Sequence, residues 1–411
     1  MAQAISYADI AIIGGGLTGK MMSLALLQSG YEICLFAPEA AQKKPDRRTT
    51  TIHAAGYKML TALGVIDHLA VPMVPIHSIN VAIGPEAKHQ SDWLLNWHET
   101  PNQMGQIEPM AYVVENHHLD SAFDKALKAN PFFDNLTIIK KTISAFEDKA
   151  ENTSLYDDEG QAYHVRLVVA CDGARSVMRD LAGIKPREEI TNQKAVITNL
   201  TLETDHDFRA CQRFLETGPI ALMPLDGKMA SMVWSTSEAE ADRLINLDDD
   251  DFAQEVTSAF GLEFGNLRPA GDRHSFALRP YFNRHLSKGR LVLAGDAAHA
   301  IHPLAGMGYN LALADAAILL DELKIAKKRG LLPDHISIKN NYAKRRQPEI
   351  IAMSAATSYL NKALSRSPNS MISRMMATGM ILFDKTALKH MISQIAKGGK
   401  LAKAPLLKGE I

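Results

Sequence analysis

The chain has 411 residues, of which 46% are hydrophobic and 22% charged, and its net charge at pH 7 is −1. This length exceeds what one compact core usually holds, so we expect two or more lobes. The balanced charge excludes a general nucleic-acid-binding protein, which would carry a basic excess. No uninterrupted apolar run reaches the ~20 residues of a membrane-spanning helix, and the N-terminus lacks the pattern of a signal peptide.

Cysteine usage points to a reducing compartment. Cys34, Cys171 and Cys211 are too few and too scattered for a disulfide framework, and no CxxC pair suggests zinc. Cys34 and Cys171 lie in apolar runs, where cysteine is usually a small buried hydrophobe. We therefore predict a cytoplasmic protein that is soluble or lies on a membrane surface.

The chain opens with a strand, a glycine turn, a helix and a second strand. The strand covers Asp9–Ile13, GGGLTG follows, and MMSLALLQSG has the helical pattern, with Gly30 as its closing glycine. YEICLFA is the next strand. This order is a βαβ unit and predicts a parallel sheet.

Further along, the pattern changes twice. Residues 72–109 tend towards alternation, ENHHLDSAFDKALKAN predicts a helix, and VRLVVACDG predicts a buried strand that ends in a glycine turn. Residues 191–279 predict a second, mostly antiparallel sheet. LVLAGDAAHA returns to a buried strand and turn, GYNLALADAAILLDELKIAKK predicts a long helix, and the chain beyond Leu331 is expected to be helical with Pro and Gly breaks.

The glycines Gly14, Gly16 and Gly19 form G-x-G-x-x-G directly after a strand and at the start of a helix. In this context they permit a tight turn, close approach of the backbone to a pyrophosphate, and close packing of helix and strand. The phosphates would then lie at the helix N-terminus. A glycine-rich turn without a ligand is the alternative, and the glycines do not distinguish NAD from FAD.

The acidic residue that binds the ribose in such folds should close the second strand. Ala37 occupies that position, and Glu39 is a candidate substitute.

Two more glycine turns follow buried strands. One contains Asp172, Gly173 and Arg179, and the other contains Gly295 and Asp296 and continues through HPLAGMGYN into a long helix. Each places a carboxylate at the carboxyl end of a strand, where open α/β sheets bind ligands. Asp172 and Asp296 could instead be helix N-caps, a common role for aspartate.

The fold class expected is α/β, with a Rossmann-type lobe, an inserted and mainly antiparallel sheet lobe, and C-terminal helices. The nucleotide-binding lobe would comprise residues 1–75, 110–185 and 286–330. The substrate lobe would comprise 76–109 and 186–285, and the helical segment 331–411.

DIAIIGGGLTG, DGARSVMR and GRLVLAGDAAHAIHPLAGMGYNLALAD resemble the three signatures of the class A flavoprotein monooxygenases. DRRTTTI, VVENHHLD and GPIALMPLDGKMASMVWS are similar to the ubiquinone-biosynthesis hydroxylases within that family. The resemblance spans about Asp9 to Asp321, with the signatures in the family's order.

The resemblance implies roles for individual residues. Gly14, Gly16 and Gly19 would hold the FAD pyrophosphate, and Asp296, after Gly295, would bind the ribityl chain. Asp172 and Gly173 would contribute to FAD and pyridine-nucleotide binding, with Arg179 closing that turn. The flavin side would be lined by the following residues: Arg48, Pro303, Gly306, Met307, Gly308 and Asn310.

The activity implied is hydroxylation of the aromatic ring of a ubiquinone precursor. NAD(P)H would reduce FAD, O₂ would form a flavin C4a-hydroperoxide, and no protein side chain would be an obligatory catalyst. The expected partner is a prenylated phenol, with peripheral contact to the inner membrane or to a quinone-biosynthesis complex.

Three departures from the family keep alternatives open. Ala37 replaces the usual glutamate, Met307 a common glutamine and Ala314 a usual arginine. The alternatives are a hydroxylase of a small soluble phenol, an isoprenoid reductase, and a non-catalytic assembly subunit that has lost flavin affinity.

Other notable residues have ordinary explanations. The histidines show no metal spacing and none is assigned to a metal; His53, His117, His118 and His274 are expected on the surface or in the core, and His299 and His302 in structural roles. Trp93 and Trp97 are expected in the core or in a pocket wall. Lys397, Lys400, Lys403 and Lys408 predict a solvated tail or, more specifically, a contact with an anionic membrane surface.

Overall fold

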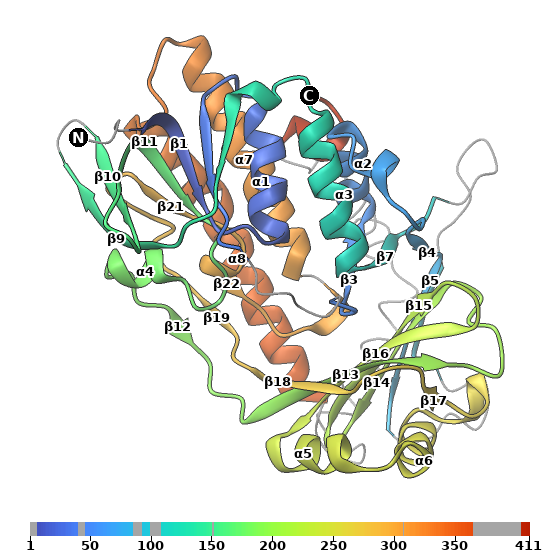
Figure 1. Ribbon diagram of the computed structural model, residues 1–411. Coiled ribbons are helices and arrows are strands. Elements are labelled where there is room, and N and C mark those ends of the chain that lie inside the picture. The colour runs from blue at the N-terminus through green and yellow to red at the C-terminus, as the bar shows by residue number, and fades with distance from the viewer. Residues whose placement is uncertain are drawn as a thin grey trace.

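A parallel sheet forms the centre of the first lobe (Figure 1). The computed structural model describes residues 6–39, 46–84, 93–98, 108–149, 152–306, 308–364 and 404–411. The strand order is β20-β21-β11-β1-β2-β8, and the pairs β21–β11, β11–β1, β1–β2 and β2–β8 are parallel. The strands are β1 (Ser6–Ile13), β2 (Ile33–Phe36), β8 (Leu136–Ile139), β11 (Ala162–Ala170), β20 (Ser287–Lys288) and β21 (Leu291–Leu293).

Two antiparallel strands extend this sheet beside the N-terminal half of β11. They are β9 (Ile143–Asp148) and β10 (Thr153–Asp157), and β10 pairs with β11. Helices α1 (Leu17–Leu27), α3 (Asn116–Ala129) and α7 (Gly308–Lys328) stand side by side against the sheet (Figure 1). The central residues of β1 and β11 are apolar and buried, and β2 is buried along its whole length, as expected for the inner strands of a parallel sheet. The predicted Rossmann-type α/β fold class is confirmed.

The second large sheet has the order β17-β13-β16-β15-β14-β5-β6, with β18 also paired to β13. All its pairs are antiparallel except β14–β5, which is parallel. Its strands are β5 (Ser78–Ile83), β6 (Leu95–His98), β13 (Gln193–Thr201), β14 (Arg209–Leu215), β15 (Gly218–Leu225), β16 (Met229–Ser237), β17 (Arg268–Pro269) and β18 (His274–Leu278).

Two helices interrupt the segment that was expected to be mostly sheet. Helices α5 (Glu238–Asn246) and α6 (Asp249–Phe260) lie beneath this sheet (Figure 1). The side chains of Ser237 and Asp248 cap them by accepting from the backbone N–H groups of Glu240 and Asp251. Ser237 and Glu240 have the spacing of a capping box, which is a sequence signal for a helix start.

Small sheets and short helices connect the lobes. One sheet has the order β3-β7-β4 and the other β12-β19-β22. Their strands are β3 (Thr49–His53), β4 (Val74–Ile76), β7 (Ala111–Glu115), β12 (Arg187–Glu188), β19 (Tyr281–Phe282) and β22 (His299–Ala300), and the short helices are α2 (Ala54–Ala62) and α4 (Val177–Leu181). Single 3₁₀ turns complete the described chain: η1 (Ile66–His68), η3 (Phe133–Asn135), η4 (Leu262–Phe264), η5 (Gly295–Ala297), η6 (Leu304–Gly306) and η7 (Pro405–Lys408).

Helix α8 (Ile336–Leu364) runs from the first lobe to the second sheet (Figure 1). Gly330 and Pro333 lie in the break between α7 and α8, as expected for these residue types, whereas Pro348 lies inside one continuous helix. Contacts with both lobes offset the ~3 kcal/mol cost of proline: the Tyr342 hydroxyl donates to the Leu293 carbonyl at 2.9 Å, and the Asn361 amide donates to Gln193 at 2.9 Å.

The C-terminal end returns to the first lobe. Ala404 and Leu406 are buried in its core, and the turn η7 packs against α2. Lys408 is exposed, as a solvated lysine would be. Lys397, Lys400 and Lys403 lie outside the described residues.

Candidate cofactor and substrate site

The glycine turn after β1 allows three backbone segments to approach one another closely. Gly14 has φ +115°, and a Cβ there would lie 2.4 Å from the Cys171 carbonyl oxygen. A Cβ on Gly19 would lie 1.7 Å from the Gly14 oxygen. These two glycines are therefore required by the packing of the protein itself.

Gly16 differs, because a Cβ there would meet no protein atom within 4 Å. Gly16 is the N-cap of α1, whose first turn holds no acidic residue. Backbone N–H groups and the positive end of the helix therefore border open space. This cradle fits a pyrophosphate.

The second predicted turn is held by its own side chains. The Asp172 carboxylate accepts from the Ser176 hydroxyl at 2.6 Å and from the Met178 backbone N–H at 3.1 Å. Arg179 is buried and donates to the Tyr281 hydroxyl and to the Ala297 carbonyl, at 3.2 and 3.4 Å. The N-cap of α4 is Ser176 and not Asp172, which instead accepts from the Ser176 hydroxyl and supports the cap, and Arg179 links this turn to the third one. Gly173 has φ +83°, and a Cβ there would meet no protein atom within 4 Å.

The third turn presents Asp296. Its side chain is exposed to solvent although the surrounding protein is dense, so it lies in a concave part of the surface. This enclosure raises the pKa of Asp296, while the charges of His299 and Arg48 act in the opposite direction. The carboxylate is thus an accessible acceptor at the end of a buried strand, suited to a ligand hydroxyl.

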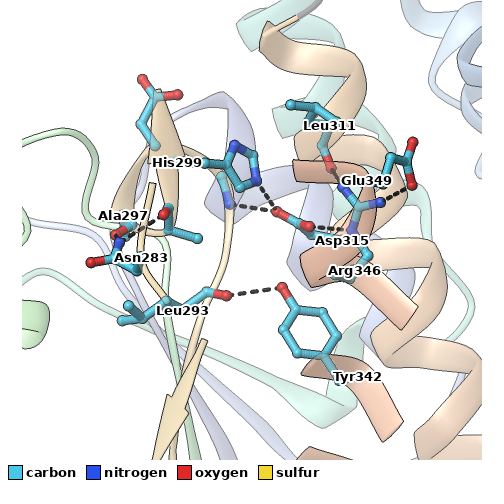
Figure 2. A network of polar contacts seen from close by, with 12 residues as sticks. Asn283, Leu293, Ala297, His299, Leu311, Asp315, Tyr342, Arg346 and Glu349 are labelled. Carbon is cyan, nitrogen blue, oxygen red and sulfur yellow. Dashed lines mark hydrogen bonds and ion pairs between the residues drawn. The ribbon is translucent and has the colours of Figure 1, made fainter. Parts of the chain in front are cut away.

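A buried polar network holds this turn from behind (Figure 2). Asp315 of α7 accepts from the Gly295 backbone N–H at 2.8 Å and lies 2.8 Å from Nε2 of His299. Its other oxygen accepts from Nε of Arg346 in α8 at 2.6 Å. Arg346 also donates to the Leu311 carbonyl and to Glu349.

The charges in this network support one another. Burial alone would raise the pKa of Asp315, but Arg346 and His299 outweigh it and hold that pKa below its usual value. The structural role expected for His299 agrees with this arrangement. Asp315 and Arg346 were not singled out from sequence; the available signal was one aspartate within the apolar helix segment LALADAAILL.

The start of α7 is fixed to β3. The Asn310 amide oxygen accepts from the His53 backbone N–H at 2.8 Å, and its nitrogen donates to the carbonyls of Thr51 and Gly306 at 2.8 and 3.1 Å. A Cβ on Gly308 would meet no protein atom within 4 Å. Met307 lies outside the described residues.

A cavity of about 920 Å³ separates these segments from the second sheet. Arg48 and Pro303 line it on the first-lobe side, and Ile197, Val233 and Phe276 line it on the sheet side. Arg48 forms a two-pronged ion pair with Asp46, at 2.8 and 2.7 Å. This pair raises the pKa of Arg48.

The departures from the family lie at distinct places. Ala37 directly follows β2 and is partly buried beside Gly15, where an added Cβ would lie 2.4 Å from the Ala37 side chain. Glu39 is exposed and pairs with Lys140 at 2.6 Å, so it is engaged on the surface. Ala314 is buried within α7.

The remaining side chains are placed as follows. Trp93 is buried in the core of the second lobe, Trp97 packs against a neighbouring apolar cluster, and all three cysteines are free and buried. His302 is fully buried, neither ring nitrogen has a hydrogen-bond partner among the described residues, and burial lowers its pKa to about 4. His53 is half-buried, and His274 lines the main cavity.

The chain belongs to the FAD-binding-domain family, whose model matches residues 7–331. It is 33% identical to the ubiquinone hydroxylase UbiL of Rhodospirillum rubrum over 366 residues, covering 88% of this chain and 83% of the relative. It is 30% identical to the 3-demethoxyubiquinol 3-hydroxylase of Escherichia coli, covering 84% of this chain and 87% of the relative. FAD is therefore the cofactor, and the expected family resemblance is confirmed.

Solved structures share the fold. The p-nitrophenol 4-monooxygenase of Pseudomonas putida superposes with a TM-score of 0.78 at 17% identity, covering 96% of this chain and all of that chain. The Klebsiella pneumoniae protein HpxO, solved with FAD and uric acid, superposes with a TM-score of 0.71 at 16% identity, covering 96% and 98%. At these sequence identities the superpositions show a shared fold.

Among the described residues, no helix is both long and apolar enough to cross a membrane.

Proposed function

We propose that this protein is an FAD-dependent monooxygenase that hydroxylates the aromatic ring of a ubiquinone precursor with NAD(P)H and O₂. The observation that carries the proposal is the similarity to two ubiquinone-ring hydroxylases along more than four-fifths of the chain. The alternative of a small soluble phenol as substrate is decided by the experiment below.

The residues present fit FAD. Gly16 and the first turn of α1 would hold the pyrophosphate, and Asp296 would accept a hydrogen bond from the ribityl chain. Gly306, Gly308, Pro303 and Arg48 would line the isoalloxazine ring. When bound, FAD supplies the redox chemistry, taking electrons from NAD(P)H and activating O₂.

The protein's own task is to position the ring and to exclude water. The cavity of about 920 Å³ has an apolar wall of Ile197, Val233 and Phe276, which suits the faces of an aromatic ring. A hydrogen bond from the Thr49 hydroxyl to the Ser231 hydroxyl, at 2.8 Å, links the two sides of the cavity. Such a fixed geometry favours transfer of the oxygen atom to one ring carbon, because a misplacement of the substrate ring by about 1 Å can lower the rate 10²-fold.

A prenylated substrate would be collected from a bilayer or from a carrier protein in the cytoplasm. The lysines expected to contact an anionic surface lie mainly outside the described residues. A truncation after Ser393 would remove these lysines. It would also remove Ala404 and Leu406 from the core, so it would change stability as well as membrane contact. The sharper variant replaces Lys397, Lys400 and Lys403 with glutamine. Each lysine near an anionic surface contributes ~1 kcal/mol, so binding to anionic vesicles should fall while FAD content stays constant.

The deciding experiment measures NAD(P)H oxidation by the FAD-loaded protein with a prenylated phenol and with the same phenol lacking its tail. Products formed under ¹⁸O₂ are analysed by mass spectrometry. We expect incorporation of one labelled oxygen and a higher kcat/KM for the prenylated phenol. A higher kcat/KM for the tail-less phenol would favour the soluble-phenol alternative. An absence of labelled product from either would refute the proposed reaction.

A further inference from the structure

A second cavity, of about 300 Å³, lies on the other side of Asn199 from the substrate cavity. Arg47 and Asn199 line both cavities. The second one is otherwise bordered by Asp226, by apolar side chains that include residues of β4, β7, β15 and β16, and by three residues that can bind a metal ion: Glu115, His117 and His118.

These three residues come from the junction of β7 and α3. Glu115 ends β7 and is the N-cap of α3, and the two histidines lie in the first turn. One ligand atom from each lies within 4.8 Å of the others, and all three residues are partly buried. The Glu115 carboxylate is 3.8 Å from Nε2 of His118, and the two imidazole rings are 4.0 Å apart between centroids. Sequence spacing alone did not predict such a site, because the residues fit no common metal motif.

Neighbouring groups orient two of the three side chains. Nδ1 of His117 lies 3.2 Å from the Asp46 carbonyl oxygen, which can only accept, so Nδ1 carries the proton and Nε2 has the free lone pair. The Asn199 amide donates to Oε1 of Glu115 at 3.1 Å, which leaves Oε2 for another partner. Hydrogen bonds of this kind to the far side of a ligand are typical of metal sites.

The local electrostatics also permit a cation. The positive end of the α3 dipole would repel a cation. Its first two backbone N–H groups, however, already donate to the carbonyls of Arg48 and Asp46, at 2.8 and 3.1 Å, which reduces this repulsion. Arg48 is paired with Asp46. Arg47 and Asp226 line the cavity with opposite charges, so the Glu115 carboxylate is a net negative charge at this point.

We propose that Glu115, His117 and His118 form a binding site for one divalent transition-metal ion of the Zn²⁺ type. Two imidazoles and one carboxylate suit ions of intermediate softness rather than Mg²⁺ or Ca²⁺. Three protein ligands leave a further coordination position for water or a small ligand in the second cavity. The site takes no part in the redox chemistry of FAD, and it is connected to the substrate cavity through Asn199, which contacts Glu115, and through Asp46, which contacts His117.

The test is calorimetric titration of ZnCl₂ into FAD-loaded protein that has been freed of metals with a chelator. We expect saturable binding of one ion per chain. Glu115→Gln, His117→Asn and His118→Gln should each weaken binding at least tenfold, because even groups that only orient ligands contribute 10–100-fold. His98→Gln removes an exposed histidine outside the cluster and should leave binding unchanged.

FAD content and the unfolding midpoint identify any variant that has failed to fold. Glu115→Gln is the most conservative, since its amide oxygen can still accept from Asn199. X-ray absorption at the zinc edge of the 1:1 complex should show two imidazole ligands. Absence of stoichiometric binding, or equal affinity in wild type and all three folded variants, would overturn the proposal.

Discussion

Arg346 of α8 donates to Asp315 of α7 at 2.6 Å, and both side chains are completely shielded from solvent. The same Asp315 carboxylate accepts the backbone N–H of Gly295, the residue before Asp296. A helix far along the chain therefore helps to hold the turn that we assign to the ribityl chain of FAD.

Replacing Arg346 with methionine should destabilise the protein and weaken FAD binding. The change leaves a buried carboxylate without its cationic partner, which typically costs about 3–5 kcal/mol. Urea unfolding and titration with FAD measure the two effects. The matched control is Arg243→Met, because Arg243 pairs with Glu240 and Glu255 on the protein surface. Such pairs contribute only about 0–1 kcal/mol, and equal losses in the two variants would contradict the role given to Arg346.

Asp296→Ala should lower FAD affinity while leaving the fold intact. A hydrogen bond to a charged group contributes about 1.5–3 kcal/mol, or roughly tenfold to a hundredfold in Kd. Quenching of flavin fluorescence measures the constant. Asp134→Ala, at an exposed aspartate of η3, serves as the control and should bind like wild type. If Asp296→Ala also binds FAD like wild type, the ribityl contact lies elsewhere.

Gly16→Val and Gly19→Val should fail in different ways. A side chain at Gly16 meets open space in the protein, so this variant should fold but exclude the pyrophosphate and contain no FAD. A side chain at Gly19 would collide with the Gly14 backbone, so this variant should lose stability itself. Circular dichroism and the flavin absorbance of the purified proteins separate the two outcomes. A yellow, active Gly16→Val protein would show that the phosphates bind elsewhere.

Ala37→Glu should tighten FAD binding. Residue 37 directly follows β2, where a carboxylate would meet the adenosine ribose in this fold. Glu39→Gln should have no effect, because Glu39 is exposed and paired with Lys140. FAD titration of both variants measures this directly. A loss of affinity in Glu39→Gln would instead assign the ribose contact to Glu39.

Acid should destabilise the protein partly through His302. Burial lowers the pKa of His302 to about 4, whereas an unfolded histidine titrates near 6.5. The unfolded chain therefore binds a proton that the folded chain excludes, and stability falls as pH drops from about 6.5 towards 4. This shift corresponds to at most about 3.5 kcal/mol.

His302→Leu should reduce that pH dependence, measured as the unfolding midpoint in urea between pH 7.5 and 4.5. Part of it should persist, because the pKa of His53 is also lowered to about 4 by burial. An identical pH profile in the variant would mean that His302 does not stay neutral in the folded protein.

Much of this protein could be predicted from residues that are adjacent in sequence. The glycines after β1, the aspartate turns after β11 and β21, and the bounds of α7 all depend on local chemistry. A turn needs glycine where φ is positive, and a helix needs a continuous run with its own periodicity. Helices α5 and α6 also carried a local signal, the caps at Ser237 and Asp248, which the alternation of the neighbouring strands obscured.

Only the tertiary structure decided which distant side chains meet. Arg346 and Asp315 are 31 residues apart, Glu39 and Lys140 are 101 apart, and Thr49 and Ser231 are 182 apart. Glu115, His117 and His118 are neighbours in sequence, yet the groups that orient them come from a loop before β3 and from β13. Local sequence patterns do not predict such partners, because each pairing depends on how whole helices and strands pack against one another.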